Sequence, residues 1–345
     1  MTAPFRLYGA ELSPYSVKVR SYLTFKNAAF EWLPRSNARQ EEFGRYAKLP
    51  LIPLVVDANE RVLQDSTPII ETLEAELDGQ SIVPSDPAVA FLAALIEDYA
   101  DEWLNKAMFH YRWSYPADQE SAANRIAAMI FEGAPPEGAV DNVRTRMIGR
   151  LHYVGSSPES APLIEASFTR AVSIFDRMLG KRPYLLGGRP SLADFGVAGQ
   201  LAQLASDPTP GAVIRAQAPN VVKWLERMQK PQVEGEFASF ADLKDDVAEL
   251  LSVEIAGAYL PWMAANADAV ARDAGGVSLE LGGIPFTQKP QRYAAKALSE
   301  LRRKRQAVTD EALADLLKQS GVDAFLLAVA DDSEADAEGE EGEEE

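Results

Sequence analysis

The sequence predicts an α/β unit at the amino terminus, followed by a larger all-helical region. The first eighty residues alternate short strand and helix signals, which is the pattern of an α/β unit. From residue 86 to about 237 the apolar residues recur at helical spacing throughout. A segment with two prolines, 81–87, separates the two patterns and is the natural linker.

The elements of the first unit follow the order β-α-β-α-β-β-α. Strands are expected at 5–8, 30–33, 51–56 and 61–64, and helices at 15–26, around Glu41 and from about Pro68. Pro68 suits the first turn of its helix, because a backbone N–H would have no intrahelical partner there.

The chain divides into four parts. We expect an α/β domain at 1–80, an all-helical domain at 86–237, a mostly helical extension at 238–330 and a disordered acidic tail at 331–345. Within the helical domain, Gly, Pro and Ser predict loops at 133–138, 155–162 and 206–211. In the extension, helical spacing covers 247–263 and 293–305, and a short strand and loop are expected at 277–288. The basic cluster of Lys296 and 302–305 is interpreted as a solvated face or a partner for the acidic tail.

Composition excludes several classes of function. The formal net charge is -18, but residues 331–345 hold ten Asp or Glu and no Lys or Arg, so the rest of the chain carries only -8. No basic stripe for a nucleic acid remains. No apolar stretch approaches the roughly 20 residues that cross a bilayer, and the start lacks the pattern of a secretory signal. We therefore expect a cytoplasmic protein with no nucleic-acid or membrane partner.

Sulfur chemistry would need a sulfur from outside the protein. The chain has no cysteine, which rules out disulfides, thiolate metal ligands and a cysteine nucleophile. The only histidines are His110 and His152, and neither lies in a motif with metal-ligand spacing, so we expect no metal.

Ser13 is the first candidate site residue. It follows the opening strand and precedes Pro14 at the start of the first helix. Free N–H groups at a helix start stabilise an anion, so a ligand thiol with an ordinary pKa of about 8.5 would ionise more readily beside them. Ser13 is therefore a candidate donor to a thiolate. Considered alone, a Ser-Pro pair is more simply a helix cap.

Ile52 and Pro53 form the second candidate site, at the entry to the third strand. Proline removes a ladder donor, so it suits a turn or an edge at this position. A cis Ile52-Pro53 bond would leave the Ile52 backbone free to pair with an extended peptide. An ordinary trans proline on an edge strand is the alternative.

The third candidate site is Asp65 and Ser66, between a strand and a helix. Ser66 and the open N–H groups of the helix start can receive a carboxylate, while Asp65 can accept from an ammonium. The pair suits a group that carries both charges on one carbon. Helix capping alone would explain Ser66 but would leave Asp65 unexplained.

In this order and spacing, the three segments resemble the amino-terminal domain of glutathione S-transferases of the serine-using, bacterial-like cytosolic type. The resemblance implies a thioredoxin-like fold for the first domain and a transferase-like helical domain after it. It also implies that Ser13 activates the glutathione thiol, that Ile52 and Pro53 pair with the peptide, and that Asp65 and Ser66 bind its γ-glutamyl group. Glutathione would be the co-substrate, an apolar small molecule the second substrate, and a homodimer the assembly.

Some positions depart from the family pattern or leave a choice. Many relatives carry Lys where this chain has Leu51, and Lys48 is a candidate substitute in glutathione binding. Relatives usually carry Glu where Asp65 stands. Tyr8 is a rival thiol activator, because tyrosine-using relatives place a phenol near the end of this strand; a strand aromatic packed into the core is the other interpretation.

A second match to the family lies at 183–195. Ser191 and Asp194 have the spacing of a capping box, with apolar residues on both sides. We expect both residues to stabilise a helix start and to take no part in catalysis.

The helix expected at 88–113 carries acidic and aromatic side chains. The acids Glu97, Asp98, Asp101 and Glu102 form two pairs four residues apart, which we interpret as a solvated acidic face. The resemblance places this helix at both the dimer contact and the second-substrate pocket. Four residues beside its apolar stripe are therefore expected to line that pocket, with core packing as the alternative: Tyr99, Trp103, His110 and Tyr111.

The sequence thus predicts an enzyme that ionises the glutathione thiol at Ser13 for attack on an apolar electrophile. Conjugation by substitution or addition, and glutathione-dependent cleavage of an ether or halide, all use this chemistry. The alternative is a non-catalytic transferase-like scaffold for binding or dimerisation, because the extension and the acidic tail are additions of the kind that carry interactions.

Overall fold

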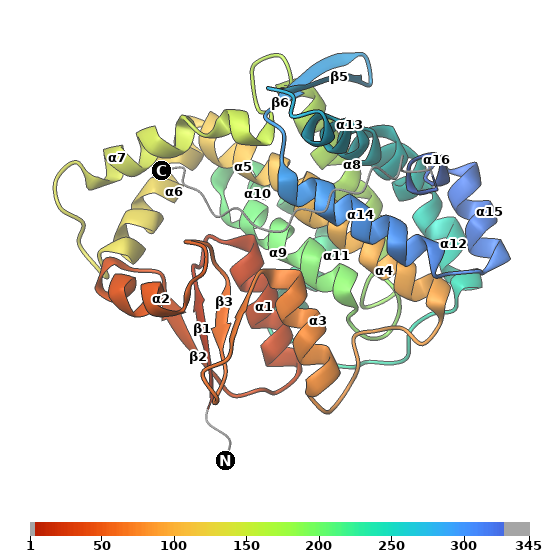
Figure 1. Ribbon diagram of the computed structural model, residues 1–345, viewed down its shortest axis with the longest axis horizontal. Coiled ribbons are helices and arrows are strands. Elements are labelled where there is room, and N and C mark those ends of the chain that lie inside the picture. Colours follow the sequence, from red (N-terminus) through yellow and green to blue (C-terminus); the bar gives the residue numbers. More distant parts are fainter. Residues whose placement is uncertain (1–3, 328–345) are drawn as a thin grey trace.

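A computed structural model of the protein describes residues 4–327 (Figure 1). Its amino-terminal part contains a mixed sheet of four strands in the order β2-β1-β3-β4. The strands are β1 Phe5–Gly9, β2 Phe30–Pro34, β3 Leu54–Val56 and β4 Val62–Gln64. Strands β1 and β2 are parallel, while β3 is antiparallel to both β1 and β4. The predicted order of strands and helices along the chain is confirmed, but β3 begins three residues later than expected, after Pro53.

Helices cover both faces of this sheet. They are α1 Pro14–Phe25, the short 3-10 helix η1 Asn37–Arg39, α2 Gln40–Tyr46 and α3 Ser66–Glu76. Because side chains alternate along a strand, Leu7 and Val55 point into the main core beside α1 and α3, whereas Tyr8 and Leu54 pack with Phe43 of α2 on the other face. Helix α1 also packs on the helical region, so its start lies near the junction of the two parts (Figure 1).

The middle of the chain is helical throughout. Its elements are α4 Pro87–Tyr99, the π-helical segment η2 Ala100–Leu104, α5 Asn105–Ser114, α6 Pro116–Ile130, α7 Ala139–Ile148, the 3-10 helix η3 Leu151–Val154, α8 Ala161–Leu179, α9 Leu192–Ser206, α10 Pro208–Gln217 and α11 Pro219–Met228. The loop at 133–138 is confirmed, and the one expected at 155–162 ends where α8 begins.

The loop predicted at 206–211 is wrong, because only Asp207 separates α9 from α10. Pro208 takes the first helical position, where its missing N–H would have no partner in any case. The next N–H, that of Thr209, donates to Asp118 Oδ1 at 2.8 Å. The prolines in this stretch therefore start a helix.

The start of α9 is fixed by a capping box formed by Ser191 and Asp194. Asp194 is fully buried and also accepts from the Leu185 N–H at 2.8 Å and from Trp224 Nε1 at 3.1 Å. Burial raises the pKa of Asp194 to about 6, although these donors oppose the shift. The carboxylate thus ties α9 to α11 and to the loop before α9.

The extension consists of helices and one hairpin. Its elements are α12 Phe240–Glu249, the π-helical segment η4 Leu250–Tyr259, α13 Leu260–Ala271, β5 Val277–Leu281, β6 Ile284–Gln288, α14 Arg292–Gln306, α15 Glu311–Gln319 and α16 Asp323–Leu326. The two predicted helical stretches are confirmed, and the expected strand and loop form an antiparallel hairpin. Helices α15 and α16 lie outside the helical stretches predicted from the sequence. The tail expected at 331–345 lies outside the described residues.

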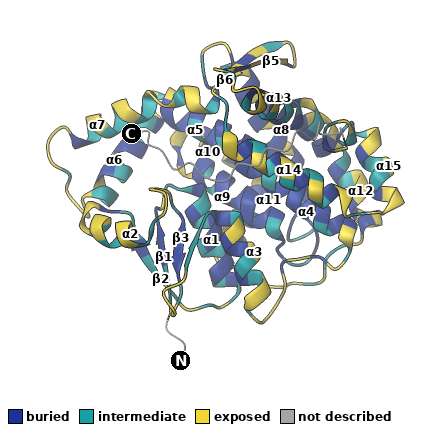
Figure 2. Ribbon diagram, in the orientation of Figure 1, coloured by how far each residue is buried: buried dark blue, intermediate teal, exposed yellow. Residues whose placement is uncertain are grey.

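One hydrophobic core runs from the sheet to the extension (Figure 2). Tyr259, Leu260, Trp262 and Met263 from the extension are fully buried. The Trp262 ring lies 6.1 Å from the Trp103 ring, and α14 packs on α4. The extension is therefore part of the helical core. Within residues 4–327 no helix combines the length and the apolar character needed to cross a membrane.

Candidate functional site

Ser13 is the amino-terminal cap of α1. Its Oγ accepts a hydrogen bond from the Ser16 N–H at 3.2 Å, and Pro14 takes the first helical position. Since the oxygen accepts that bond, its own proton is available for an outside acceptor. The half-buried hydroxyl lies at the positive end of the helix, so it can stabilise an anion.

The loop before Pro53 is held by Gln64, which ends β4. Gln64 Nε2 donates to the carbonyl oxygens of Leu49 and Leu51, both at 2.7 Å, and Gln64 Oε1 accepts from the Leu49 N–H at 3.3 Å. The Ile52-Pro53 peptide bond is cis. Within residues 4–327 the Ile52 backbone has no hydrogen-bond partner, which leaves both of its polar groups available to a peptide.

The departure from the family pattern in this loop, Leu51, and its candidate substitute, Lys48, are both exposed. Leu51 is 59% exposed, and Lys48 is exposed as well. Among the described residues Lys48 makes no ion pair, so its ammonium is available to a ligand that reaches the loop.

Asp65 and Ser66 lie where α3 begins. The Asp65 N–H donates to the Pro53 carbonyl at 3.4 Å, which links this site to the proline loop. Asp65 has a φ of 81°, in the left-handed region that a residue with a side chain rarely adopts. Such strain is often kept at functional sites. Ser66 is buried, and the first N–H groups of α3 have no partner within the helix.

Beneath this pair lies Lys18 of α1, a residue to which the sequence pattern assigned no role. Its Nζ donates to Thr67 Oγ1 at 2.9 Å and to Asp101 Oδ2 at 2.6 Å, lies 3.5 Å from Ser66 Oγ, and pairs with Glu97. Burial lowers the pKa of Lys18, but the two carboxylates outweigh it and raise that pKa above its ordinary value. One buried cation thus joins α1, the start of α3 and the α4–η2 helix.

The solvated acidic face predicted on this helix is therefore wrong. Glu97, Asp101 and Glu102 are at most 7% exposed, and Asp98 is only partly exposed. Burial raises the pKa of Asp101 to about 6 and that of Glu102 to about 8. Helix α1 covers one side of these acids and the extension the other, and the spacing of acids along one helix cannot reveal either neighbour.

The aromatic residues expected to line the second-substrate pocket are core residues instead. None of the four exceeds 5% exposure: Tyr99, Trp103, His110 and Tyr111. Tyr99 Oη donates to Glu254 Oε2 at 3.1 Å, and Trp103 Nε1 donates to Ser167 Oγ at 2.9 Å. His110 Nδ1 lies 2.8 Å from Ser156 Oγ. The extension and α8 cover this side of the helix, which the sequence spacing could not anticipate.

Tyr8 also lies in the core, on the face of the sheet that packs on α2. It is fully buried, and its hydroxyl donates to Glu42 Oε1 at 2.6 Å. Burial, together with the Glu42 carboxylate, raises the pKa of Tyr8 above its ordinary value. The phenol is thus a weaker acid than a free tyrosine.

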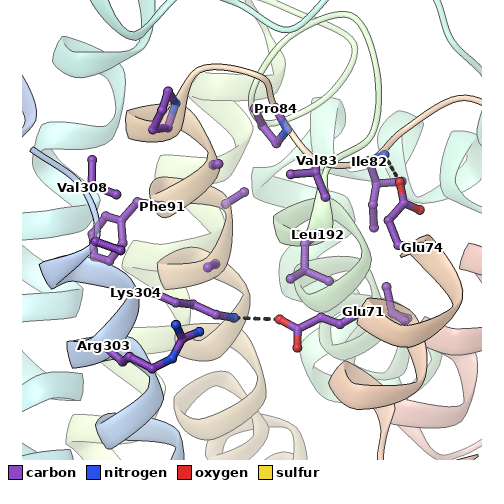
Figure 3. A pocket seen from close by; sticks show the side chains of 16 residues that line it. Glu71, Glu74, Ile82, Val83, Pro84, Phe91, Leu192, Arg303, Lys304 and Val308 are labelled. Atoms are coloured by element: carbon purple, nitrogen blue, oxygen red, sulfur yellow. Dashed lines mark hydrogen bonds and ion pairs between the residues drawn. The ribbon is translucent and has the colours of Figure 1, made fainter. Parts of the chain in front are cut away.

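The basic cluster of the extension is only partly solvated, which corrects that interpretation. Arg305 is buried and pairs with Asp323 at 2.8 Å, whereas Lys304 pairs with Glu71 of α3 at 2.7 Å. Lys304 and Glu71 point at each other beside an apolar pocket of about 420 Å³ that α3, α4 and α14 enclose (Figure 3). None of the residues predicted to bind glutathione lines this pocket.

Sequence reasoning also missed two residues that position the site. A signal for Lys18 existed, because it stands next to Val19 and four residues before Tyr22, both fully buried, and so interrupts an apolar helix face. Gln64 gave no such signal, since its role depends on a loop fifteen residues earlier folding back onto β4.

Comparisons with known proteins match the amino-terminal sheet domain and the helical region after it to two domain families, in the same order. The family described as glutathione S-transferase, N-terminal domain matches residues 7–81, and glutathione S-transferase, C-terminal domain matches residues 141–227. The isoprene-epoxide–glutathione S-transferase of Rhodococcus sp. (strain AD45) is 28% identical over 64% of this chain and 92% of its own length. Glutathione S-transferase 3 of Zea mays is 25% identical over 65% and 88%.

A solved glutathione S-transferase from Rhodospirillum rubrum F11 is 18% identical, covers 85% of this chain and 99% of its own, and superimposes with a TM-score of 0.47. Both domain families fall in their expected order on the sheet and on the helices that follow it. The matches at 7–81 and 141–227, together with the named relatives, thus support a member of the glutathione S-transferase family.

Proposed function

We propose that the protein binds glutathione across the Pro53 loop and the start of α3, and that the Ser13 hydroxyl stabilises the ligand's thiolate. The observation that carries the proposal is a chain of contacts that links three segments. Ser13 caps this helix, Lys18 of the same helix contacts Ser66, and Asp65 is bonded to Pro53.

Each part of glutathione has a matching group in this arrangement. The cysteinyl backbone would pair with the free backbone of Ile52. The γ-glutamyl ammonium would meet Asp65, and its carboxylate would meet Ser66 and the first N–H groups of α3. The cysteine sulfur would then face Ser13 at the start of α1.

The reaction we propose is attack by the bound thiolate on an electrophilic carbon. Donation from Ser13 and the α1 dipole favour the ionised sulfur, so less thiol remains protonated near neutral pH. An apolar epoxide is the first electrophile to test, since one relative is named for isoprene epoxide. A carbon–sulfur bond would form as a ring carbon–oxygen bond breaks, and the alkoxide would take a proton from water.

Ser13 is preferred over Tyr8 as the activator. The Tyr8 hydroxyl already donates to Glu42, and burial raises its pKa. We expect Ser13→Ala to lower kcat by about 10²-fold, comparable with the loss of one oxyanion donor, and to raise the pKa of the bound thiol. Tyr8→Phe is the matched control and should leave that pKa unchanged. The ultraviolet absorbance of the thiolate, titrated on bound glutathione, measures the thiol pKa in both variants. A pKa raised by Tyr8→Phe and unchanged by Ser13→Ala would assign the role to Tyr8.

Exposed Leu51 and the large extension favour a second candidate, a transferase-like scaffold without catalysis. Retention on immobilised glutathione separates the two. The enzyme should be retained and Ser66→Ala should be retained less, whereas a wild-type protein that flows through would overturn the proposed glutathione site.

We also propose a homodimer, as in the family. The resemblance assigns helix α4 to the dimer contact, but in this chain α14 packs on α4. A dimer that used this face would have to include α14. Light scattering during gel filtration gives the mass in solution, and a monomer mass across the working concentration range would refute the dimer.

A further inference from the structure

We propose that Tyr293 and Lys296 of the extension helix α14 complete the subsite for the γ-glutamyl group, an inference that rests on the glutathione site proposed above. The extension would then be part of the binding site as well as of the core. Neither residue lies in the stretches matched by the two domain families, 7–81 and 141–227.

A pocket of about 210 Å³ adjoins Asp65 and joins three helices. The start of α3 contributes Asp65 and Thr67, α4 contributes Asp98, and α14 contributes Tyr293 and Lys296. At about 30 Å³ for each water molecule, the space suits a small polar head and is too small for a whole tripeptide. The helix of the extension thus faces the predicted γ-glutamyl contact across an open space.

Tyr293 and Asp65 line the same pocket. Burial raises the pKa of Asp65, while the Tyr293 hydroxyl and the Lys18 ammonium oppose that shift. Burial raises the pKa of the Tyr293 phenol, although the residue as a whole is 53% exposed, and the Asp65 carboxylate raises that pKa further. The Tyr293 hydroxyl would therefore stabilise the ionised Asp65 carboxylate, which is the group that an ammonium would meet.

Lys296 is the cation of the pocket that remains available. Lys304 also lines the pocket, but it is held by Glu71 at 2.7 Å. Among residues 4–327, Lys296 has no carboxylate within ion-pair distance. The pocket thus offers acids for an ammonium and one cation for a carboxylate, the two charges that a γ-glutamyl group carries on one carbon.

Two analogues of glutathione test each contact separately. One lacks the α-carboxylate of the γ-glutamyl group (4-aminobutanoyl-Cys-Gly), and the other lacks its α-amino group (glutaryl-Cys-Gly). By calorimetry on the full chain, Lys296→Met should weaken glutathione about tenfold, the effect of one lost charged contact, yet leave affinity for the carboxylate-free analogue unchanged. Tyr293→Phe should weaken glutathione several-fold but spare the amine-free analogue.

The matched control is Arg292→Met, an exposed cation on the same helix that does not line the pocket. It should bind glutathione like the wild type. Equal glutathione affinity in Lys296→Met, Tyr293→Phe and the control would overturn this inference while leaving the proposed function intact. A wild-type protein that binds no glutathione would instead refute the proposed function itself. Thermal unfolding of every variant separates loss of binding from loss of fold.

Discussion

Two buried charge clusters flank the α4–η2 helix, and they differ in where their cation lies. The Lys18 cluster consists of Lys18, Ser66, Thr67, Glu97 and Asp101. The Glu254 cluster consists of Tyr99, Ser167, Arg170 and Glu254. Residues two apart on a helix point to nearly opposite sides, so Tyr99 faces away from Glu97 and Asp101. The Lys18 side chain is fully buried, whereas the Arg170 side chain is 42% exposed.

This difference separates a cluster that depends on its cation from one that does not. Water cannot replace Lys18, so its removal would strand two buried carboxylates. Solvent already reaches Arg170, and Glu254 has two hydroxyl donors besides. Only the Lys18 cluster touches a residue of the proposed glutathione site, so only that cluster should couple stability to binding.

Lys18→Met is expected to have the largest effect. Leaving a buried charge without its partner typically costs about 3–5 kcal/mol, and here two carboxylates lose the same partner. Urea unfolding measures the loss. It should be smaller at pH 5 than at pH 8, because Asp101, whose pKa burial raises to about 6, can then protonate. Where folded protein remains, affinity for glutathione should fall as well.

The matched control for this prediction removes all three charges together, as Lys18→Met with Glu97→Gln and Asp101→Asn. It should regain most of the lost stability, since neutral groups of similar shape need no cation. A single Lys18→Met variant as stable as the wild type at pH 8 would contradict the assignment of Lys18 as the required cation.

Buried charge clusters of this kind could not be predicted from the sequence, whereas the elements of the first domain could. The first domain could be anticipated because its signals are local: Pro14 opens α1, Pro53 precedes a short strand, and Pro68 stands in the first turn of α3. Burial of Glu97 depends on α1 and on the extension, which are distant in sequence. Spacing within one helix gives the same pattern for a solvated acid and for a buried one.

The predicted site has the same limit. Ser13 and Asp65 could be proposed because Ser and Pro are recognisable sequence signals of a helix start. Tyr293 could not, because it reaches Asp65 only after more than two hundred residues of chain have folded. The aromatic residues of the central helix gave a correct apolar stripe, but the stripe alone does not distinguish an open pocket from a core that α13 covers.

Glu254→Gln is expected to have the next largest effect, about 2 kcal/mol, because an uncharged acceptor weakens the bonds from Tyr99, Ser167 and Arg170. Burial raises the pKa of Glu254 against these donors. Unfolding in urea at pH 8 measures the loss, and glutathione affinity should stay within twofold of the wild type. A parallel loss of affinity would mean that the two clusters are coupled.

Glu102 is a buried acid that forms no ion pair among the described residues, although Lys106 lies close enough to lower its pKa, and its replacement should stabilise the protein by at least about 1 kcal/mol at pH 8. Burial raises its pKa from an ordinary value of 4.5 to about 8 in the folded protein. Between these values the folded state holds more protons than the unfolded state, so its contribution to stability falls as pH rises. The gain of Glu102→Gln over wild type should therefore grow from pH 5 to pH 8; a gain independent of pH would contradict the shift.

Arg170→Met should have the smallest effect, below about 1 kcal/mol, as is usual for an ion pair that solvent reaches. It deletes the same charge with the same replacement as Lys18→Met, so the two variants differ mainly in the burial of the cation. The ratio of their losses in free energy of unfolding, measured in urea at one pH, shows how much the burial of the cation contributes to stability. A loss from Arg170→Met as large as that from Lys18→Met would mean that Glu254 depends on its arginine despite the exposure. Added salt decides this case further, because it should reduce the effect at Arg170 and leave the effect at Lys18 nearly constant.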